Sequence, residues 1–168
     1  MKDHFALFGL APAYVLDVAA LEQAYRAIQQ RIHPDRHAQS GDAARRASMQ
    51  WTTRVNEAYR TLKSPVQRAK YLLEMNGVDV AFETDTQMPP EFLGRQMALR
   101  EALAEASEPA VLDRLRDEVR AQAGALERSI GELIDERRDP AAAAGEVRKL
   151  MFLHKLAEQI ERGYEEIE

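Results

Sequence analysis

A histidine and an aspartate two positions apart, His33 and Asp35, are the side chains of this sequence best suited to proton transfer. An imidazole can take up or release a proton near neutral pH, and a carboxylate can orient it. Pro34, which lies between them, has no amide hydrogen and disfavours helical geometry at His33, so the tripeptide should end a helix at a loop tip. A surface tip lacks the desolvation and the third group that tune a catalytic pKa, which favours recognition over acid-base catalysis.

Metal and cofactor chemistry finds little support elsewhere in the sequence. His37 follows His33 by four positions, a spacing that suits metal ligands on a helix, but Pro34 breaks that helix and no third ligand is near. His4 and His154 each stand alone in sequence, and there is no cysteine, which excludes disulfides, thiol catalysis and cysteine-ligated centres within the chain. No glycine-rich phosphate loop is present. We therefore expect no cofactor, no metal site and no enzymatic activity.

Two amphipathic segments flank the tripeptide. Upstream, apolar residues recur at spacings of four, three and four: Leu21, Tyr25, Ile28 and Ile32. Downstream, a second stripe contains Ala47, Trp51, Val55, Ala58, Tyr59 and Leu62. Because only a short polar loop separates the two segments, they should pack as an antiparallel helical hairpin with residues 33–35 at its tip.

Helix-capping residues divide the first half of the chain. Asp17 and Asp42 are expected as N-caps of the two hairpin helices, because a carboxylate there accepts hydrogen bonds from unpaired amides. Residues 64–67 form a capping box with Pro65 at the first helical position, and Gly77 is a natural stop. No strand-like alternation of useful length occurs. The sequence therefore predicts an all-α fold.

Three further helices are predicted after residue 90. The first starts at Pro90, the second after Ser107 as cap with Pro109 just inside, and the third after Asp139-Pro140. Their inner stripes are Leu112, Leu115, Val119, Gln122, Leu126, Ser129 and Leu133 for the second, and Ala143, Val147, Leu150, Leu153, Ala157, Ile160, Tyr164 and Ile167 for the third. Short connections favour a three-helix bundle. We expect a first domain at 1–76, a linker at 77–89 and a bundle at 90–168.

Several apolar side chains lie off these inner stripes. On the first bundle helix, Phe92 and Leu99 share one side, whereas Leu93 and Met97 point about a right angle or more away. On the third, Phe152 and its neighbour Met151 lie well off the stripe. Such residues either form a partner-binding patch, fill the edges of the bundle or pack against the first domain.

Charge is distributed unevenly along the chain. Residues 1–76 carry 11 Lys and Arg against 7 Asp and Glu, whereas residues 89–168 carry 12 against 18. Arg26, Gln29, Gln30 and Arg31 lie away from the apolar stripe and lead toward the tripeptide. This face is either a docking surface or merely solvated. A net charge of −5 and a pI near 5.5 argue against nucleic-acid binding. No apolar run approaches the length of a membrane span, and the N-terminus predicts no targeting peptide, so we expect a cytoplasmic protein.

The His33-Pro34-Asp35 tripeptide and the helical segments around it resemble a known family, the J-domains that stimulate ATP hydrolysis by DnaK-type chaperones. The resemblance rests on Phe5 to Leu10, Leu21 to Arg36, Val55-Asn56-Glu57-Ala58-Tyr59 with Leu62, Ser64-Pro65, Arg68-Ala69 and Tyr71-Leu72-Leu73. The second half, Phe92-Leu93 to Glu101 and Arg148-Lys149-Leu150 to Leu156, is similar to the HscB family of J-type co-chaperones in iron-sulfur cluster assembly.

The resemblance implies two partners. An HscA/DnaK-type chaperone would contact Tyr25, Arg26, Gln29, Arg31, His33, Pro34, Asp35 and Arg36. An IscU-type iron-sulfur scaffold protein would contact Leu93, Met97, Arg100, Glu101 and Phe152. The chain lacks the glycine-rich region and the cysteine zinc module of general-purpose J-proteins, so a dedicated client is expected, and a client other than the scaffold stays open as the alternative.

Overall fold

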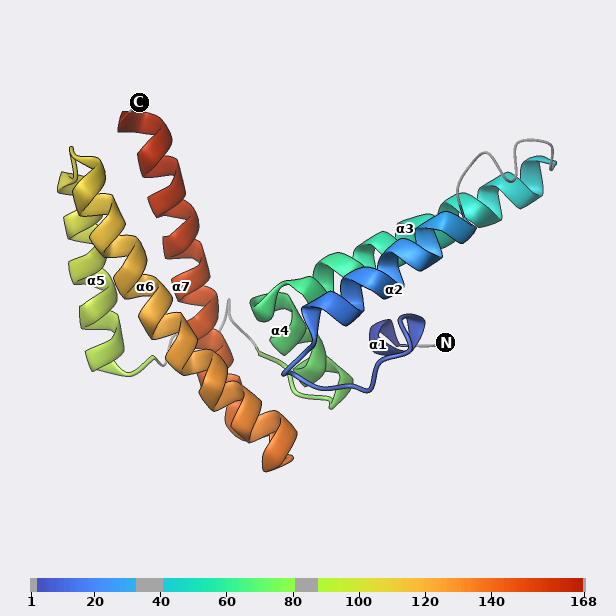
Figure 1. The fold of residues 1–168 in the computed structure, drawn as a ribbon. Helices are drawn as coiled ribbons and strands as arrows, with labels where there is room; N and C mark the ends of the chain where they lie inside the picture. Colours follow the sequence, from blue (N-terminus) through green and yellow to red (C-terminus); the bar gives the residue numbers. More distant parts are fainter. Residues whose placement is uncertain (1–2, 33–40, 81–87, 168) are drawn as a thin grey trace. The chain divides into compact units, whose positions relative to one another are not determined.

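In a computed structural model, residues 3–32, 41–80 and 88–167 of the chain are described, and they contain helices and no strand. The elements are α1 (His4–Leu7), α2 (Val18–Arg31), α3 (Asp42–Lys63), α4 (Pro65–Met75), α5 (Pro90–Glu105), α6 (Pro109–Gly131), the π-helix η2 (Glu132–Glu136) and α7 (Pro140–Ile167) (Figure 1). The all-α prediction is confirmed. The chain divides into two compact units, Met1–Leu72 and Leu73–Glu168, each described here by itself.

The first unit is built on the predicted hairpin of α2 and α3, which lie side by side (Figure 1). Glu22 near the start of α2 lies 3.8 Å from Lys63 at the end of α3. One turn further along α2, the Tyr25 hydroxyl donates a 2.5 Å hydrogen bond to Asn56 Oδ1. Because the partners on α3 run backwards as α2 runs forwards, the two helices are antiparallel, as predicted.

The core of the first unit contains the start of the predicted α2 stripe and the end of the predicted α3 stripe. Leu21, Val55, Ala58 and Leu62 are fully buried together with Phe5 from α1. The stripe was predicted too long, however, because Ala47 and Trp51 are exposed. The reason is length: α3 has 22 residues and α2 has 14, so the first turns of α3 extend past the last residue of α2 (Figure 1).

Most predicted helix ends of this half are observed. Asp17 accepts a hydrogen bond from the Ala20 amide, and the Ser64 hydroxyl accepts one from the Gln67 amide. Gly77 follows α4 with a φ of 72°, a left-handed conformation that glycine adopts at low cost. The prediction for Asp42 was wrong by one position, because Gly41 is the N-cap and Asp42 is the first residue of α3. Its carboxylate still lies in the first turn, where the helix dipole favours negative charge.

Arg68 on α4 joins three segments of the first unit. Its side chain is only 7% exposed. Its Nε donates to the Tyr14 carbonyl at 2.7 Å, and its Nη1 donates to the Leu62 carbonyl at 2.6 Å. Leu62 is in the last turn of α3, where carbonyls have no partner within the helix. One guanidinium therefore stabilises both the end of α3 and the segment before α2.

Replacing Arg68 by methionine should lower the free energy of unfolding of the first unit by about 2–4 kcal/mol, because two buried carbonyls lose a charged donor. Lysine should restore little of this, since a single ammonium cannot reproduce the forked geometry. Trp51 is the single tryptophan of the chain, so its fluorescence during urea unfolding reports on this unit. Gln67→Met, an exposed change on the same helix, is the control. Equal stability of Arg68→Met and the wild type would contradict this role.

The second unit contains the predicted bundle, in which α5, α6 and α7 pack on one another. Its core combines residues from all three helices: Leu99, Leu115, Val119, Leu153, Leu156 and Ile160. Helix α5 begins at Pro90, and Asp139 accepts a hydrogen bond from the Ala142 amide at the start of α7, both as predicted. The predicted cap Ser107 was wrong. Because Pro109 is the first helical residue, the N-cap is Glu108.

The end of α6 departs from the predicted pattern. Ser129 and Leu133 were assigned to the inner stripe, but Ile130 and Ile134 are the buried residues. At about 100° per residue, Ile130 lies five full turns after buried Leu112 and so on the same side of α6, whereas Ser129 lies about 100° away from that side. The chain then widens into η2, whose Arg137 amide donates to the Glu132 carbonyl five residues earlier at 2.9 Å. The π-helix was not predicted.

In the described part of the chain, no helix is both long enough and apolar enough to cross a membrane.

The segment that follows α4 packs against side chains of the second unit. Val80 is buried, and Arg148 Nη1 donates a 3.3 Å hydrogen bond to its carbonyl.

Candidate functional site

The first candidate surface is the basic face of α2, defined as Arg26, Gln29, Gln30 and Arg31. All four side chains are exposed. The helix ends at Arg31, and Ile32 caps it by donating its amide to the Ile28 carbonyl at 3.1 Å. The predicted contact residues His33, Pro34, Asp35 and Arg36 lie outside the described residues, as does His37. Two exposed arginines, both away from the apolar stripe of α2, give this face the positive charge that a partner with acidic groups would meet.

Tyr25, which the sequence placed among the chaperone-binding residues, lies in the interface between α2 and α3. Its ring stacks on that of Tyr59 with 3.9 Å between centroids and 6° between planes. Its edge-to-face contact with Phe8 spans 6.5 Å. Together with the hydrogen bond to Asn56, these contacts fix which side of α2 faces α3. The side chain is half-buried, and its contact with a partner stays a prediction.

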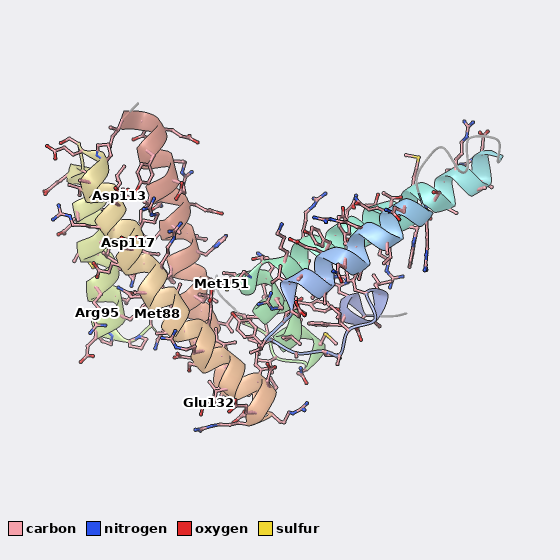
Figure 2. All side chains as sticks on the ribbon, viewed as in Figure 1. Met88, Arg95, Asp113, Asp117, Glu132 and Met151 are labelled. Carbon is pink, nitrogen blue, oxygen red and sulfur yellow. The ribbon has the colours of Figure 1, made fainter. Side chains whose placement is uncertain are left out.

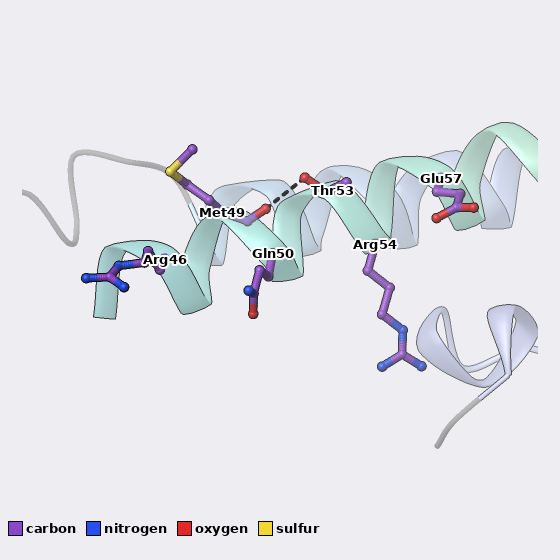
Figure 3. A pocket seen from close by; sticks show the side chains of 6 residues that line it. All are labelled: Arg46, Met49, Gln50, Thr53, Arg54 and Glu57. Atoms are coloured by element: carbon purple, nitrogen blue, oxygen red, sulfur yellow. Dashed lines mark hydrogen bonds between the residues drawn. The ribbon is translucent and has the colours of Figure 1, made fainter. Parts of the chain in front are cut away.

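A shallow groove on α3 was not predicted from the sequence (Figure 3). Its lining side chains come from successive turns of the helix: Arg46, Met49, Gln50, Thr53, Arg54 and Glu57. Met49 is 70% exposed, and the Thr53 hydroxyl donates to its carbonyl at 3.0 Å. The sequence signal was weak, because polar and charged residues off an apolar stripe read as ordinary solvated surface.

The second candidate surface is the outward face of α5, defined as Leu93, Met97, Arg100 and Glu101. Their spacing of four, three and one places them on one side of a helix. Met97 is 63% exposed, Leu93 is half-buried, and both charged residues are exposed. In Figure 2, Arg95 marks α5 and Met151 marks α7. The structure therefore leaves the Met97 side chain largely in solvent, off the inner stripe as the sequence predicted.

Phe152 on α7 adjoins this face through Arg100. The Arg100 guanidinium carbon lies 6.0 Å from the centre of the Phe152 ring, a cation–π geometry. The ring also packs edge-to-face on Phe92 at 6.4 Å, and Lys149 Nζ lies 5.9 Å from the Phe92 ring centre. Phe152 thus fills part of the bundle edge and is half-buried. Phe92 therefore contacts the Phe152 ring, and Lys149 contacts Phe92 in turn. Periodicity alone did not indicate these contacts.

The two histidines within the described residues, His4 and His154, each contact a neighbouring side chain of the fold. The ring of His4 stacks on that of Tyr71 with 4.3 Å between centroids, and burial lowers the pKa of His4 while Glu57 opposes this shift. His154 Nε2 lies 3.2 Å from Glu158 on the same helix face. Among the described residues, no three His, Cys, Asp or Glu side chains gather in a way that could hold a metal ion.

Comparison with known families gives a match for each half of the chain. Residues 3–71 match the family described as DnaJ domain, and residues 88–161 match that described as HSCB C-terminal oligomerisation domain. These matched ranges contain the basic face of α2 and the outward face of α5, respectively.

Relatives extend the match over the full length. Co-chaperone protein HscB homologs of Burkholderia multivorans and Cupriavidus taiwanensis are 48% and 47% identical, covering 100% and 99% of this chain and 98% and 96% of their own. The solved chaperone HscB of Vibrio cholerae is 33% identical with a TM-score of 0.84, covering 99% of this chain and all of its own. Human co-chaperone protein HscB is 28% identical with a TM-score of 0.90, covering 96% of this chain and 82% of its own. With a J-domain in its first half and relatives nearly half identical along its whole length, the chain belongs to the HscB family of co-chaperone proteins.

Proposed function

We propose that this co-chaperone stimulates ATP hydrolysis by an HscA/DnaK-type chaperone and delivers an IscU-type iron-sulfur scaffold protein to it. The observation that carries the proposal is the 63% exposure of Met97 on the outward face of α5, within a chain that also contains a J-domain. A J-domain alone would serve any client, whereas a second unit with an exposed apolar face suits one dedicated protein.

The first unit acts on the chaperone through charge and through residues 33–36. Arg26 and Arg31 meet an acidic surface and speed the encounter. The Asp35 carboxylate pairs in bidentate fashion with an arginine of the chaperone, while His33 and Arg36 complete the contact. The hydrolysed ATP belongs to the chaperone, so the chain itself performs no chemistry.

The second unit holds the scaffold protein on Leu93, Met97 and Phe152, with Arg100 and Glu101 as polar companions. Apolar side chains surrounded by charged ones are typical of interface anchors, because the rim excludes water while the centre is desolvated. We assign the J-domain to residues 1–76, the linker to 77–89 and the client-binding bundle to 90–168. The division of the chain after Leu72 and the start of α5 at Pro90 support this assignment.

With this function we expect the protein in the cytoplasm, where a chaperone has ATP. A tagged chain should recover both the chaperone and the scaffold protein from an extract of its own cells, identified by mass spectrometry. Recovery of the chaperone with another protein, and without the scaffold, would favour a J-domain co-chaperone for a different dedicated client. Recovery of no chaperone would contradict the proposal.

Reversing Arg26 and Arg31 to glutamate should slow association with the chaperone about tenfold or more at low salt, because steering by exposed charges is lost. Wild-type association should itself slow as salt rises, since charges farther apart than about 8–10 Å are screened at physiological ionic strength. Stopped-flow association rates at low and high salt measure both effects. Arg120→Glu with Arg128→Glu, two exposed reversals on α6, is the matched control. If the association rates do not change with salt, the basic face of α2 is merely solvated and does not bind the chaperone.

A further inference from the structure

Helix α5 is apolar on two sides. Phe92, Leu99 and Leu103 face the bundle core, whereas Leu93 and Met97 belong to the outward face. At about 100° per residue, the centres of these two sets lie roughly 110–120° apart around the helix. A rotation of α5 by about half that angle would keep Phe92 at the seam and bring Leu93 toward it. Apolar burial alone therefore sets the rotation of this helix weakly.

One polar residue interrupts the apolar contact of α5 with α6. Gln96 lies among the core-facing residues and is only 3% exposed. Its Nε2 donates a 3.1 Å hydrogen bond to Gln122 Oε1 on α6, and Gln122 Nε2 in turn donates to Glu118 Oε1 at 3.4 Å. Within the described part of the chain, Gln96 Oε1 is buried without a hydrogen-bond partner. Among the described residues, Gln122 on α6 is thus the one hydrogen-bond partner of the Gln96 side chain.

We propose that the hydrogen bond between Gln96 and Gln122 sets the rotation of α5 and so keeps Leu93 and Met97 outward. Gln96 is a positioning residue, because it acts on the outward face without being part of it. The use of that face for a client rests on the proposed function, whereas the rotation itself can be tested without any partner.

The physical argument is one of specificity. A buried amide loses its partner if α5 turns, and an unpaired polar group in a protein interior is costly. Apolar residues of similar shape at both positions would fill the same space in several rotations of the helix. A single buried polar residue is known to fix the register of packed helices at some cost in stability. The unpartnered Gln96 Oε1 is such a cost.

The test replaces both glutamines by methionine, which has a similar length and no hydrogen-bonding amide. The absence of native cysteine allows single reporter thiols, introduced as Met97→Cys or Ala102→Cys in otherwise intact chains. Met97 lies on the outward face, and Ala102 packs partly against the core on the opposite side of α5. The rate of reaction with N-ethylmaleimide measures how accessible each thiol is.

In the Gln96→Met and Gln122→Met background, the thiol introduced by Met97→Cys should react about twofold or more slowly, because labelling occurs only from molecules in which the thiol is exposed. The thiol introduced by Ala102→Cys should react correspondingly faster. The melting temperature should be equal to or higher than that of the wild type. Ala121→Cys, on the exposed side of α6, is the control whose rate should not change. Gln122→Asn, which keeps an amide opposite Gln96, should restore at least part of both wild-type rates.

Two outcomes would overturn the inference. Unchanged rates at both positions would show that apolar packing alone fixes α5. Faster labelling at both positions would show that the helix loosens and does not rotate. Neither result depends on the scaffold protein, so the proposed function could stand if this inference failed. If scaffold binding were absent while the two rates changed in opposite directions, the reverse would hold.

Discussion

Replacing His33 by glutamine is expected to reduce stimulation of the chaperone ATPase by at least about thirtyfold, the loss that corresponds to removal of one interface hot spot of about 2 kcal/mol. His33 adjoins a proline, where the helix of the basic face has already ended at Arg31. A side chain at a predicted loop tip is expected to contribute to contact with a partner and not to core packing. Circular dichroism and the thermal melt should therefore stay near those of the wild type. The measurement is the steady-state rate of phosphate release by the chaperone with increasing concentrations of each variant.

The same substitution at another surface histidine is the control. His154 is exposed on α7 and pairs with Glu158 on its own helix, so His154→Gln should leave stimulation unchanged. Full stimulation of the chaperone by a folded His33→Gln chain would contradict a role of the His33-Pro34-Asp35 tripeptide in stimulation.

Truncating Leu93, Met97 and Phe152 to alanine should weaken binding of the scaffold protein by well over tenfold, because interface anchors of this size each contribute about 1–2 kcal/mol or more. Met97 is largely exposed and should cost little stability, whereas half-buried Leu93 and Phe152 should cost less than the roughly 2–5 kcal/mol of a fully buried side chain. Calorimetric titration with the scaffold protein and a thermal melt of the same sample separate the two effects.

Two matched changes complete that experiment. Met49→Ala removes a similarly exposed methionine from α3 and should leave scaffold binding intact. Leu99→Ala empties a core position of α5 and should lower the melting temperature clearly. If the triple variant melts like Leu99→Ala, these residues belong to the core. If it melts like the wild type and still binds the scaffold, the client site lies elsewhere.

Local rules of helix formation explain why so much of the fold could be predicted. Asp17, residues 64–67 and Asp139 cap helices through contacts only three residues long, which the sequence displays directly. The predictions at Asp42 and Ser107 were each wrong by one position, because the N-caps are Gly41 and Glu108. In the second case the proline at position 109 decided, because it can occupy the first helical position and fixes its predecessor as the cap.

Features that depend on the relative position of two helices could not be predicted. Periodicity shows which side of a helix is buried, but not how far the helix is displaced along its neighbour. The hydrogen bond from Gln96 to Gln122 and the edge-to-face contact of Phe92 with Phe152 depend on that displacement. The π-helix at Glu132–Glu136 was also missed, because one extra residue in a turn changes no pattern that the sequence displays.

The candidate surfaces show the same limit. The sequence placed Leu93 and Met97 off the inner stripe, because that prediction requires only the period of a single helix. It could not show that Arg100 covers the ring of Phe152, which comes from another helix. Tyr25 could be assigned to an apolar stripe, but its stack on Tyr59 depends on the pairing of α2 with α3.

The central claim is that one molecule joins the chaperone to the scaffold protein. The most direct measurement is the chaperone ATPase rate at a low concentration of scaffold protein. The co-chaperone is added as an equimolar mixture of two variants: the His33→Gln chain, and the chain in which Leu93, Met97 and Phe152 are replaced by alanine. Each variant retains the surface that the other lacks. The account predicts that the mixture does not restore the rate given by the wild-type chain, because neither molecule can bring both partners together. Full restoration by the mixture would contradict the claim.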